Sequence, residues 1–197
     1  MGIPKIPLTK FKNVAPPSCN PTNVYVKDAT CLLKPGAVSW IILIARAYQF
    51  VDTLDAAEWA TAITAGNIMV IPVSGKLNPP EMVTIDGKGA LRKQNISNKF
   101  GFDVKCDYPD TNMSLMNRIN YQGRNFGVLF VYNDDSSATK TAYAAMQDDA
   151  ADYAYVDLMA GFLNENPLLR EWNIKGEWHA KFMPQVLDIP TSILDAA

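Results

Sequence analysis

The stretch NKFGFDVKCDYPDTNMSLMNRINYQGRNFGVLFVY, residues 98–132, decides the fold. Over residues 99–108, apolar side chains alternate without a break with polar residues and glycine, which is the two-residue period of a strand with one buried face. Pro109 ends this strand, and apolar residues at helical spacing predict a short helix over residues 112–119. A second strand is predicted over residues 125–132. The unit is therefore strand, short helix, strand.

A second unit with the same order of elements is predicted upstream. The run AVSWIILIARAY, residues 37–48, is too continuously apolar for a strand exposed to water, so we interpret it as a central strand. Residues 54–65 carry a narrow apolar face and are predicted to form a helix, because Asp55 and Glu58 have the spacing of a capping box at its start. A strand is expected over residues 68–73. The two units match in element order only.

The remaining patterns are weaker. A strand is predicted over residues 81–86, followed by hairpin turns that lead back into the strand of the first unit. Residues 139–151 are rich in alanine, and their class stays open, with helix favoured. Alternation predicts strands over residues 153–162 and 172–182. The second alternation is longer than an average strand, which suggests a bulge at Gly176.

The chain is predicted to form an extended N-terminal arm, residues 1–21, and one β-rich domain, residues 22–197. The arm is dense in proline and carries lysines but no acid, so it forms neither a regular helix nor a central strand. It is either a disordered tail or an arm that becomes ordered along a neighbouring subunit. Pro184 and Pro190 bracket a C-terminal tail. The expected fold class is β-rich α+β, an antiparallel β-sandwich or barrel with one or two flanking helices.

Composition limits the classes of function. The 197 residues are 48% apolar and 19% charged, which is less charge than is usual for a soluble chain, and buried subunit contacts would explain the deficit. The net charge of −2 and pI of about 5.4 argue against a protein whose whole surface binds nucleic acid. The sequence has neither a signal-peptide pattern nor about 18 consecutive apolar residues. We expect a soluble protein made in the cytoplasm, with no membrane partner.

The cysteines and the single histidine do not form a recognisable site. Cys19, Cys31 and Cys106 are an odd number without a CxxC pair, and His179 lies far from all of them, so a zinc site is not expected. Cys106 falls on the apolar side of its strand and is interpreted as a buried hydrophobic residue. Whether Cys19 and Cys31 pair stays open, with the reduced state favoured. His179 is expected on a polar, solvated strand face.

Other candidate motifs have structural interpretations. The serines lack the GxSxG elbow of hydrolases, and the dipeptide Gly75-Lys76 is interpreted as a turn because the upstream glycine of a phosphate loop is missing. Tryptophans and tyrosines that could stack on sugars or bases are assigned to the core: Trp172, Trp178, Tyr153 and Tyr155. Acidic residues that could bind calcium are assigned to a solvated surface: Asp134, Asp135, Asp148, Asp149 and Asp152. We therefore predict no catalytic, cofactor-binding or metal-binding residues and no enzymatic activity.

The order of elements in FGFDVKCDYPDTNMSLMNRINYQGRNFGVLFVYND, residues 100–134, resembles virion structural proteins of tailed bacteriophages, most closely tail tube proteins. The resemblance covers residues 37–182 in element order. It implies a homo-oligomer of stacked, six-membered rings in the virion, with sheets joined edge to edge into a barrel. It also implies contacts with other virion proteins and a lumen through which DNA passes without sequence preference, which an acidic surface would favour.

Two other functions stay open. The N-terminal arm and the second strand-helix-strand unit depart from the simple family pattern, so a head-tail connector or a capsid-associated protein that binds another virion protein is the main alternative. An enzyme or ligand-binding module is the third, and it would need a concave pocket with convergent polar groups. Rings or tubes would indicate the first function, and a monomer that needs a partner would indicate the second.

Overall fold

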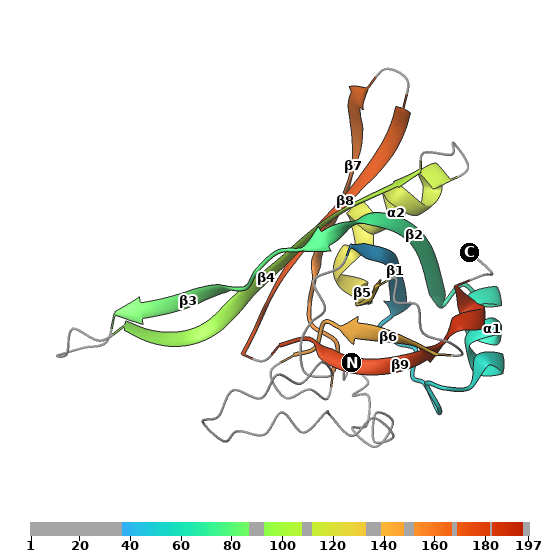
Figure 1. The fold of residues 1–197 in the computed structure, drawn as a ribbon, viewed down its shortest axis with the longest axis horizontal. Coiled ribbons are helices and arrows are strands. Elements are labelled where there is room, and N and C mark those ends of the chain that lie inside the picture. The colour runs from blue at the N-terminus through green and yellow to red at the C-terminus, as the bar shows by residue number, and fades with distance from the viewer. Residues whose placement is uncertain are drawn as a thin grey trace.

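The computed structural model describes residues 37–86, 93–107, 112–132, 139–147, 152–166, 169–181 and 183–194. Several expectations lie outside these residues, namely the arm at residues 1–21, the pairing of Cys19 with Cys31, the turns at residues 87–92 and four of the five candidate calcium ligands. The described part of the chain is dominated by strands, with two α-helices (Figure 1).

The strands are β1 (Val38–Ala45), β2 (Ile68–Leu77), β3 (Glu81–Asp86), β4 (Lys93–Asp107), β5 (Phe126–Tyr132), β6 (Thr139–Ala144), β7 (Asp157–Asn166), β8 (Leu169–Ala180) and β9 (Gln185–Pro190). The helices are α1 (Ala56–Thr64) and α2 (Met113–Gln122), with short 3-10 turns η3 (Gly123–Asn125) and η4 (Thr191–Ile193). All nine strands belong to one antiparallel sheet in the order β7-β8-β4-β2-β1-β5-β6-β9, and β3 pairs with β4 beside this path. The predicted β-rich α+β class is confirmed. The two ends of the sheet do not pair within the described strands, so it is open and not a closed barrel.

Strand β1 is central because both of its faces are covered. Ile41 and Leu43 enter one hydrophobic core, whereas Ile42 and Ile44 enter a second core on the opposite face, and all four are fully buried. Helix α2 contributes Met116 and Ile119 to the first core. Helix α1 contributes Trp59 and Ala62 to the second. The strands of one predicted unit, β1 and β2, therefore lie side by side between β4 and β5, the strands of the other unit. The helices of the two units, α1 and α2, cover opposite faces of the sheet.

Helix α1 begins where the sequence predicts. The Asp55 carboxylate accepts a hydrogen bond from the Ala57 amide at 2.9 Å, which caps the helix. The Glu58 carboxylate does not complete a capping box, because it accepts instead from the amides of Val51 at 2.6 Å and Asp52 at 2.8 Å. It therefore fixes the preceding loop onto the helix. Gly66 follows the helix with a φ of +73°, a conformation that glycine adopts without strain.

Two predictions are wrong: the helix favoured over residues 139–151 and the C-terminal tail after Pro184. Residues 139–144 form β6, and the tail after Pro184 forms β9, which pairs with β6 along its whole length. Ala142 and Ala144 pack in the second core while Tyr143 packs in the first, an alternation that a strand satisfies and a helix does not. The small alanine side chains hide this period in the sequence.

Strand β8 runs through Gly176 without the predicted bulge. Its register with both β4 and β7 is continuous there, so Gly176 has another role. A Cβ atom at this position would overlap Cε1 of Phe102 and lie 2.7 Å from its Cζ. Glycine therefore leaves room for a core aromatic ring.

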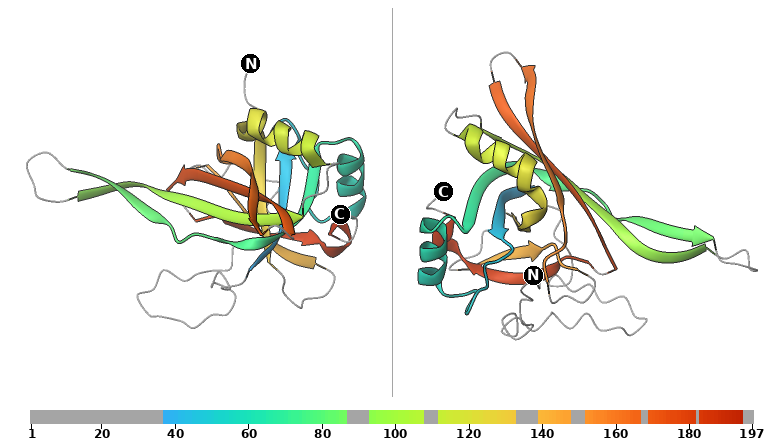
Figure 2. Two further views of the ribbon diagram at one scale, coloured as in Figure 1. Left: turned by 90° about the horizontal axis from the view of Figure 1, so that it is seen from above. Right: turned by 180° about the vertical axis from the view of Figure 1, so that it is seen from behind.

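Two hairpins project from the body of the sheet. The β3–β4 hairpin extends to the left in Figure 1, and the β7–β8 hairpin extends upward, with α2 lying alongside β7 (Figures 1 and 2). They diverge because β3 pairs with the first part of β4, whereas β7 pairs with the part of β8 that lies against the last part of β4. We call the four strands β3, β4, β7 and β8 the projecting sheet.

Candidate functional site

The projecting sheet has one polar face, which is the outer side of the alternation that opened the sequence analysis. Residues at odd positions of β4 from Lys99 to Asp107 lie on this face, beside their partners on β8 and the residues of β7 that pair with those partners. Three ion pairs cross from β4 to β8: Lys99–Glu177 at 2.7 Å, Asp103–Lys175 at 3.0 Å and Lys105–Glu171 at 3.5 Å. The hydrogen bonds and attraction of Glu177 raise the pKa of Lys99. The face therefore carries both signs of charge, arranged so that cations and anions neutralise each other.

An aromatic layer supports the polar face from beneath. The Phe100 and Phe130 rings stack against Trp178 with centroids 5.1 Å and 5.8 Å apart, and Phe102 meets Phe130 edge to face at 4.9 Å. All four rings are buried. Such packed aromatic residues hold the strands in one register, because a slip of one residue would turn the rings to solvent. The ion pairs are therefore carried on a rigid base.

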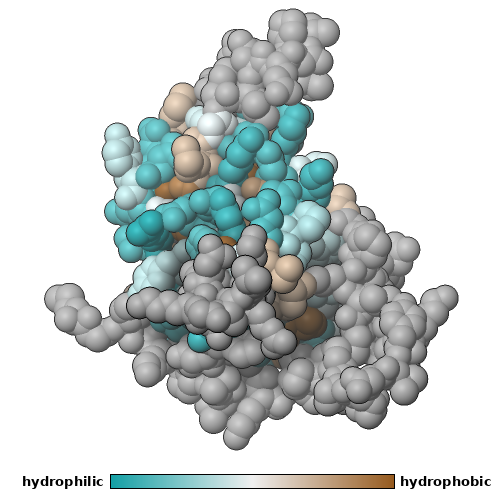
Figure 3. Space-filling view, turned by 90° about the vertical axis from the view of Figure 1, so that its left-hand side faces the viewer, coloured by the Kyte–Doolittle hydropathy of each residue, from teal (hydrophilic) through white to brown (hydrophobic). Residues whose placement is uncertain are grey.

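Two hollows are lined in part by residues at the start of β7. The first has a volume of about 410 Å³, lies over Gly101, which has no side chain to fill it, and is lined by residues that include Glu81, Asp103 and Lys175. The second, of about 280 Å³, is lined by the end of α2 and by η3. Asp157 lines both. Figure 3 shows that hydrophilic side chains cover most of the described surface on the side from which β3 and β4 project.

Residue types that are common in protein interfaces surround Asp157. Arg124 donates two hydrogen bonds to its carboxylate, one of them from Nη2 at 2.9 Å, and this pairing lowers the pKa of Asp157. Tyr121 is 89% exposed and Met159 is 71% exposed. Tyrosine, methionine and arginine are enriched where proteins meet. We call Tyr121, Arg124, Asp157 and Met159 the β7 patch.

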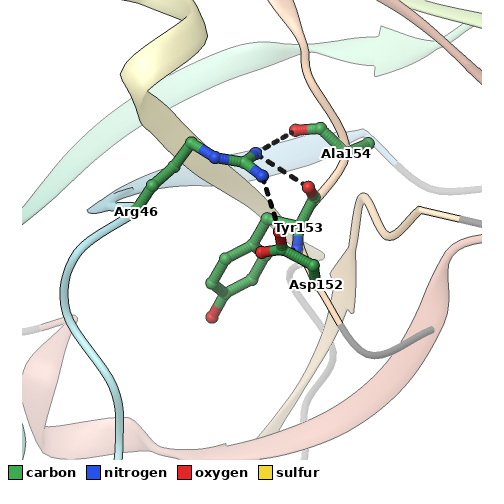
Figure 4. Close-up of polar contacts among 4 residues, drawn as sticks. All are labelled: Arg46, Asp152, Tyr153 and Ala154. Carbon is green, nitrogen blue, oxygen red and sulfur yellow. Dashed lines mark hydrogen bonds and ion pairs between the residues drawn. The ribbon is translucent and has the colours of Figure 1, made fainter. Parts of the chain in front are cut away.

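A buried polar cluster is formed around Arg46, which directly follows the C-terminal end of β1 (Figure 4). The Arg46 guanidinium donates to the Tyr153 carbonyl at 2.7 Å, the Ala154 carbonyl at 3.0 Å and the Asp152 carboxylate at 3.0 Å, and it lies 3.9 Å from the centroid of the Tyr155 ring. Both charged side chains are about nine-tenths buried. The cluster ties residues 152–155 to the sheet, so its role is structural.

The positions of Asp152 and Tyr155 in this cluster differ from those predicted from the sequence. Asp152 is a buried ion-pair partner and not part of a solvated acidic surface. Tyr155 is 39% exposed and stacks on Arg46, so only Tyr153 of this pair lies in the core. Burial raises the pKa of Tyr153, whose ring packs where a Cβ atom on Gly127 would otherwise lie.

The other candidate residues lie largely where they were predicted. Trp172 and Trp178 are in the core, and His179 is exposed on the polar face. Cys106 is buried, and that burial, with the charges of two nearby acids, raises the pKa of its thiol to about 11. Gly75 is not in a turn but inside β2, where a Cβ atom would lie 2.6 Å from Cα of Val104. The close approach of two strands explains this glycine.

The described residues contain no group of three or more His, Cys, Asp or Glu side chains placed to hold a metal ion. Of the helices in this part of the chain, none is long and apolar enough to cross a membrane. Comparison of the chain with models of protein families, with curated proteins and with solved structures gives no match. The fold defines the class only as an open antiparallel sheet with two helices and two projecting hairpins. Function has to be argued from the projecting sheet itself.

Proposed function

We propose that this protein is a structural subunit that assembles into stacked rings, forming a tube of the kind found in phage tails. The observation that carries the proposal is the projecting sheet. Within the described strands, β3 pairs only with β4 and β7 pairs only with β8, so each has an outer edge that offers backbone groups to another strand. An exposed edge of this kind can pair with a strand of another chain, and a second copy of this chain would supply that strand.

The two edges favour a ring over a simple two-fold dimer. A two-fold contact uses the same surface on both copies, whereas β3 and β7 are different strands on different hairpins. A contact between unlike surfaces repeats from copy to copy until it closes into a ring or continues as a helix. The low content of charged residues agrees with a surface that subunit contacts bury.

The polar face of the projecting sheet is the surface that we assign to the DNA channel. Lysines that neutralise DNA phosphates release the counterions condensed on the DNA, and this release drives binding without sequence preference. Here Lys99, Lys105 and Lys175 each lie beside a carboxylate, so a phosphate has to displace a protein partner that is already present. Such a face lets DNA slide without holding it.

A substitution on this face tests the channel assignment. Glu177→Gln removes the carboxylate that neutralises Lys99, and Asp188→Asn removes one negative charge from β9 as a matched control. We expect tubes of Glu177→Gln to retain more DNA in co-sedimentation at low salt than tubes of the wild type or the control. The amounts of retained DNA should become equal as the salt concentration is raised. Equal retention by all three proteins would contradict the assignment.

A connector or capsid-associated protein is the second candidate, and the β7 patch favours it. The exposed side chains of Tyr121 and Met159, together with Arg124, would suit a dissimilar virion protein. We propose no catalytic role for the residues around the two hollows, because most of their charged side chains pair with one another or with Arg124.

Negative-stain electron microscopy of the full chain, with its mass in solution recorded alongside, tests the assembly. We expect rings or tubes with a central channel to form as the concentration rises. A folded monomer at high concentration would overturn the proposal and favour the connector, which needs its partner to assemble.

A further inference from the structure

One side chain of α2 occupies the edge of β7 in the way a neighbouring strand would. The Asn120 carboxamide donates from Nδ2 to the Ala160 carbonyl at 2.9 Å, and its Oδ1 accepts from the Ala160 amide at 2.7 Å. A residue in a neighbouring strand would make the same pair of bonds. The outward-facing backbone groups of Ala160 are therefore already used.

The turn after α2 covers the next outward position on the same edge. Outward groups recur every second residue, so Leu158 faces the same way as Ala160. Gly123 lies directly against it, because a Cβ atom on Gly123 would be 2.8 Å from Cβ and 2.9 Å from the carbonyl oxygen of Leu158. Only a residue without a side chain approaches this closely. Residues 157–160 are thus closed to another strand.

Residues 161–166, the remainder of β7, follow the positions that Asn120 and Gly123 contact. Strand β7 continues into the projecting part of its hairpin (Figures 1 and 2). We propose that Asn120 and Gly123 cover the base of the β7 edge, so that a strand from a second copy of this chain adds only to residues 161–166. This inference rests on the proposed self-assembly.

The strand that fits this site is β3 of the second copy. It is a six-residue strand with β4 as its one partner among the described strands, and it lies on a hairpin that projects away from the body. Strand β9 also ends the sheet and pairs only with β6 among the described strands, but it belongs to the body and not to a projecting hairpin (Figure 1). Pairing β3 with the outer part of β7 joins two unlike edges, as a ring requires.

Hydrogen exchange tests the two steps separately. In unassembled protein, we expect the Ala160 amide to exchange about tenfold faster in Asn120→Ala than in wild type, because its hydrogen-bond acceptor is lost. Gln122→Ala is the control, since its side chain reaches Arg118 on the exposed side of the same helix. On assembly of wild type, we expect new protection over residues 81–86 and 161–166, and none over residues 157–160.

The outcomes distinguish this inference from the proposed function. An Ala160 amide that exchanges no faster in Asn120→Ala would overturn the covering of the edge. New protection at residues 157–160 but not at 161–166 would overturn the site of strand addition. If Asn120→Ala releases Ala160 but the full chain stays monomeric at every concentration, the covering stands, whereas self-assembly and the strand-addition site both fail.

Discussion

The buried Arg46–Asp152 pair gives the sharpest prediction for stability. Arg46→Met keeps an unbranched apolar stem but removes three hydrogen bonds, and it leaves the carboxylate of Asp152 and two backbone carbonyls without their cation (Figure 4). Removing one partner of a buried pair costs about 3–5 kcal/mol, because the other charge stays buried without compensation. We expect a loss of this size in the free energy of unfolding. Asp152→Asn leaves the Arg46 cation with the carbonyls of Tyr153 and Ala154 and an amide oxygen as acceptors, so its expected cost is smaller, about 1–3 kcal/mol.

Urea unfolding followed by tryptophan fluorescence and circular dichroism measures both variants. With a slope of about 2 kcal/mol per molar urea, the Arg46→Met midpoint should fall by roughly 1.5–2.5 M. Lys99→Met is the control, because it breaks the Lys99–Glu177 pair, whose side chains are 38% and 53% exposed, and its midpoint should barely move. If Arg46→Met shifts the midpoint no more than Lys99→Met, the buried cluster does not stabilise the fold and the reasoning is wrong.

Four further predictions concern the core and the arm. Phe102→Ala should lower the free energy of unfolding by about 3–5 kcal/mol, and a thermally neutral variant would remove Phe102 from the core. Gly176→Ala should cost about 1–3 kcal/mol because its methyl group meets the Phe102 ring, whereas Gly161→Ala, with nothing nearer than 4.0 Å, should not destabilise. Cys106, with a thiol pKa of about 11, should resist iodoacetamide at pH 8 until the protein unfolds. Because burial favours the neutral thiol, its contribution to the free energy of unfolding is complete below pH 9 and is lost as the pH rises toward 11. Deletion of residues 1–17 should weaken assembly and leave the circular dichroism spectrum of the fold intact.

The long, regular patterns in the sequence predicted the sheet well. Continuous alternation over residues 99–107 became the last part of β4, and the apolar run at residues 37–48 contains β1. These predictions hold because a strand with one buried face has alternating apolar residues, and a strand with two buried faces has a continuous apolar run. Residues 139–144 show the limit: alanine is small enough for either face, so the period is lost, and pairing with β9 decides the structure.

The candidate site was less predictable because its parts are distant in sequence. Arg46 and Asp152 meet only after the sheet has formed, and Asn120 meets Ala160 across forty positions. No local pattern in the sequence distinguishes Asn120 from any other polar residue on an exposed helix face. The sequence does show that the glycines are unusual residues for strands, but only the structure shows that Gly176 makes room for a ring.

The helix α2 links the fold to the proposed assembly. Its apolar side buries Met116 and Ile119 in the core beneath β7, so the same packing that stabilises the helix brings Asn120 to the edge. An edge that is open along its whole length would accept strands in several registers. Covering its base leaves one short segment, and a short segment beside a fixed end restricts the register in which a neighbour can pair. The helix that completes the core would in this way also set how far each subunit is displaced from the next.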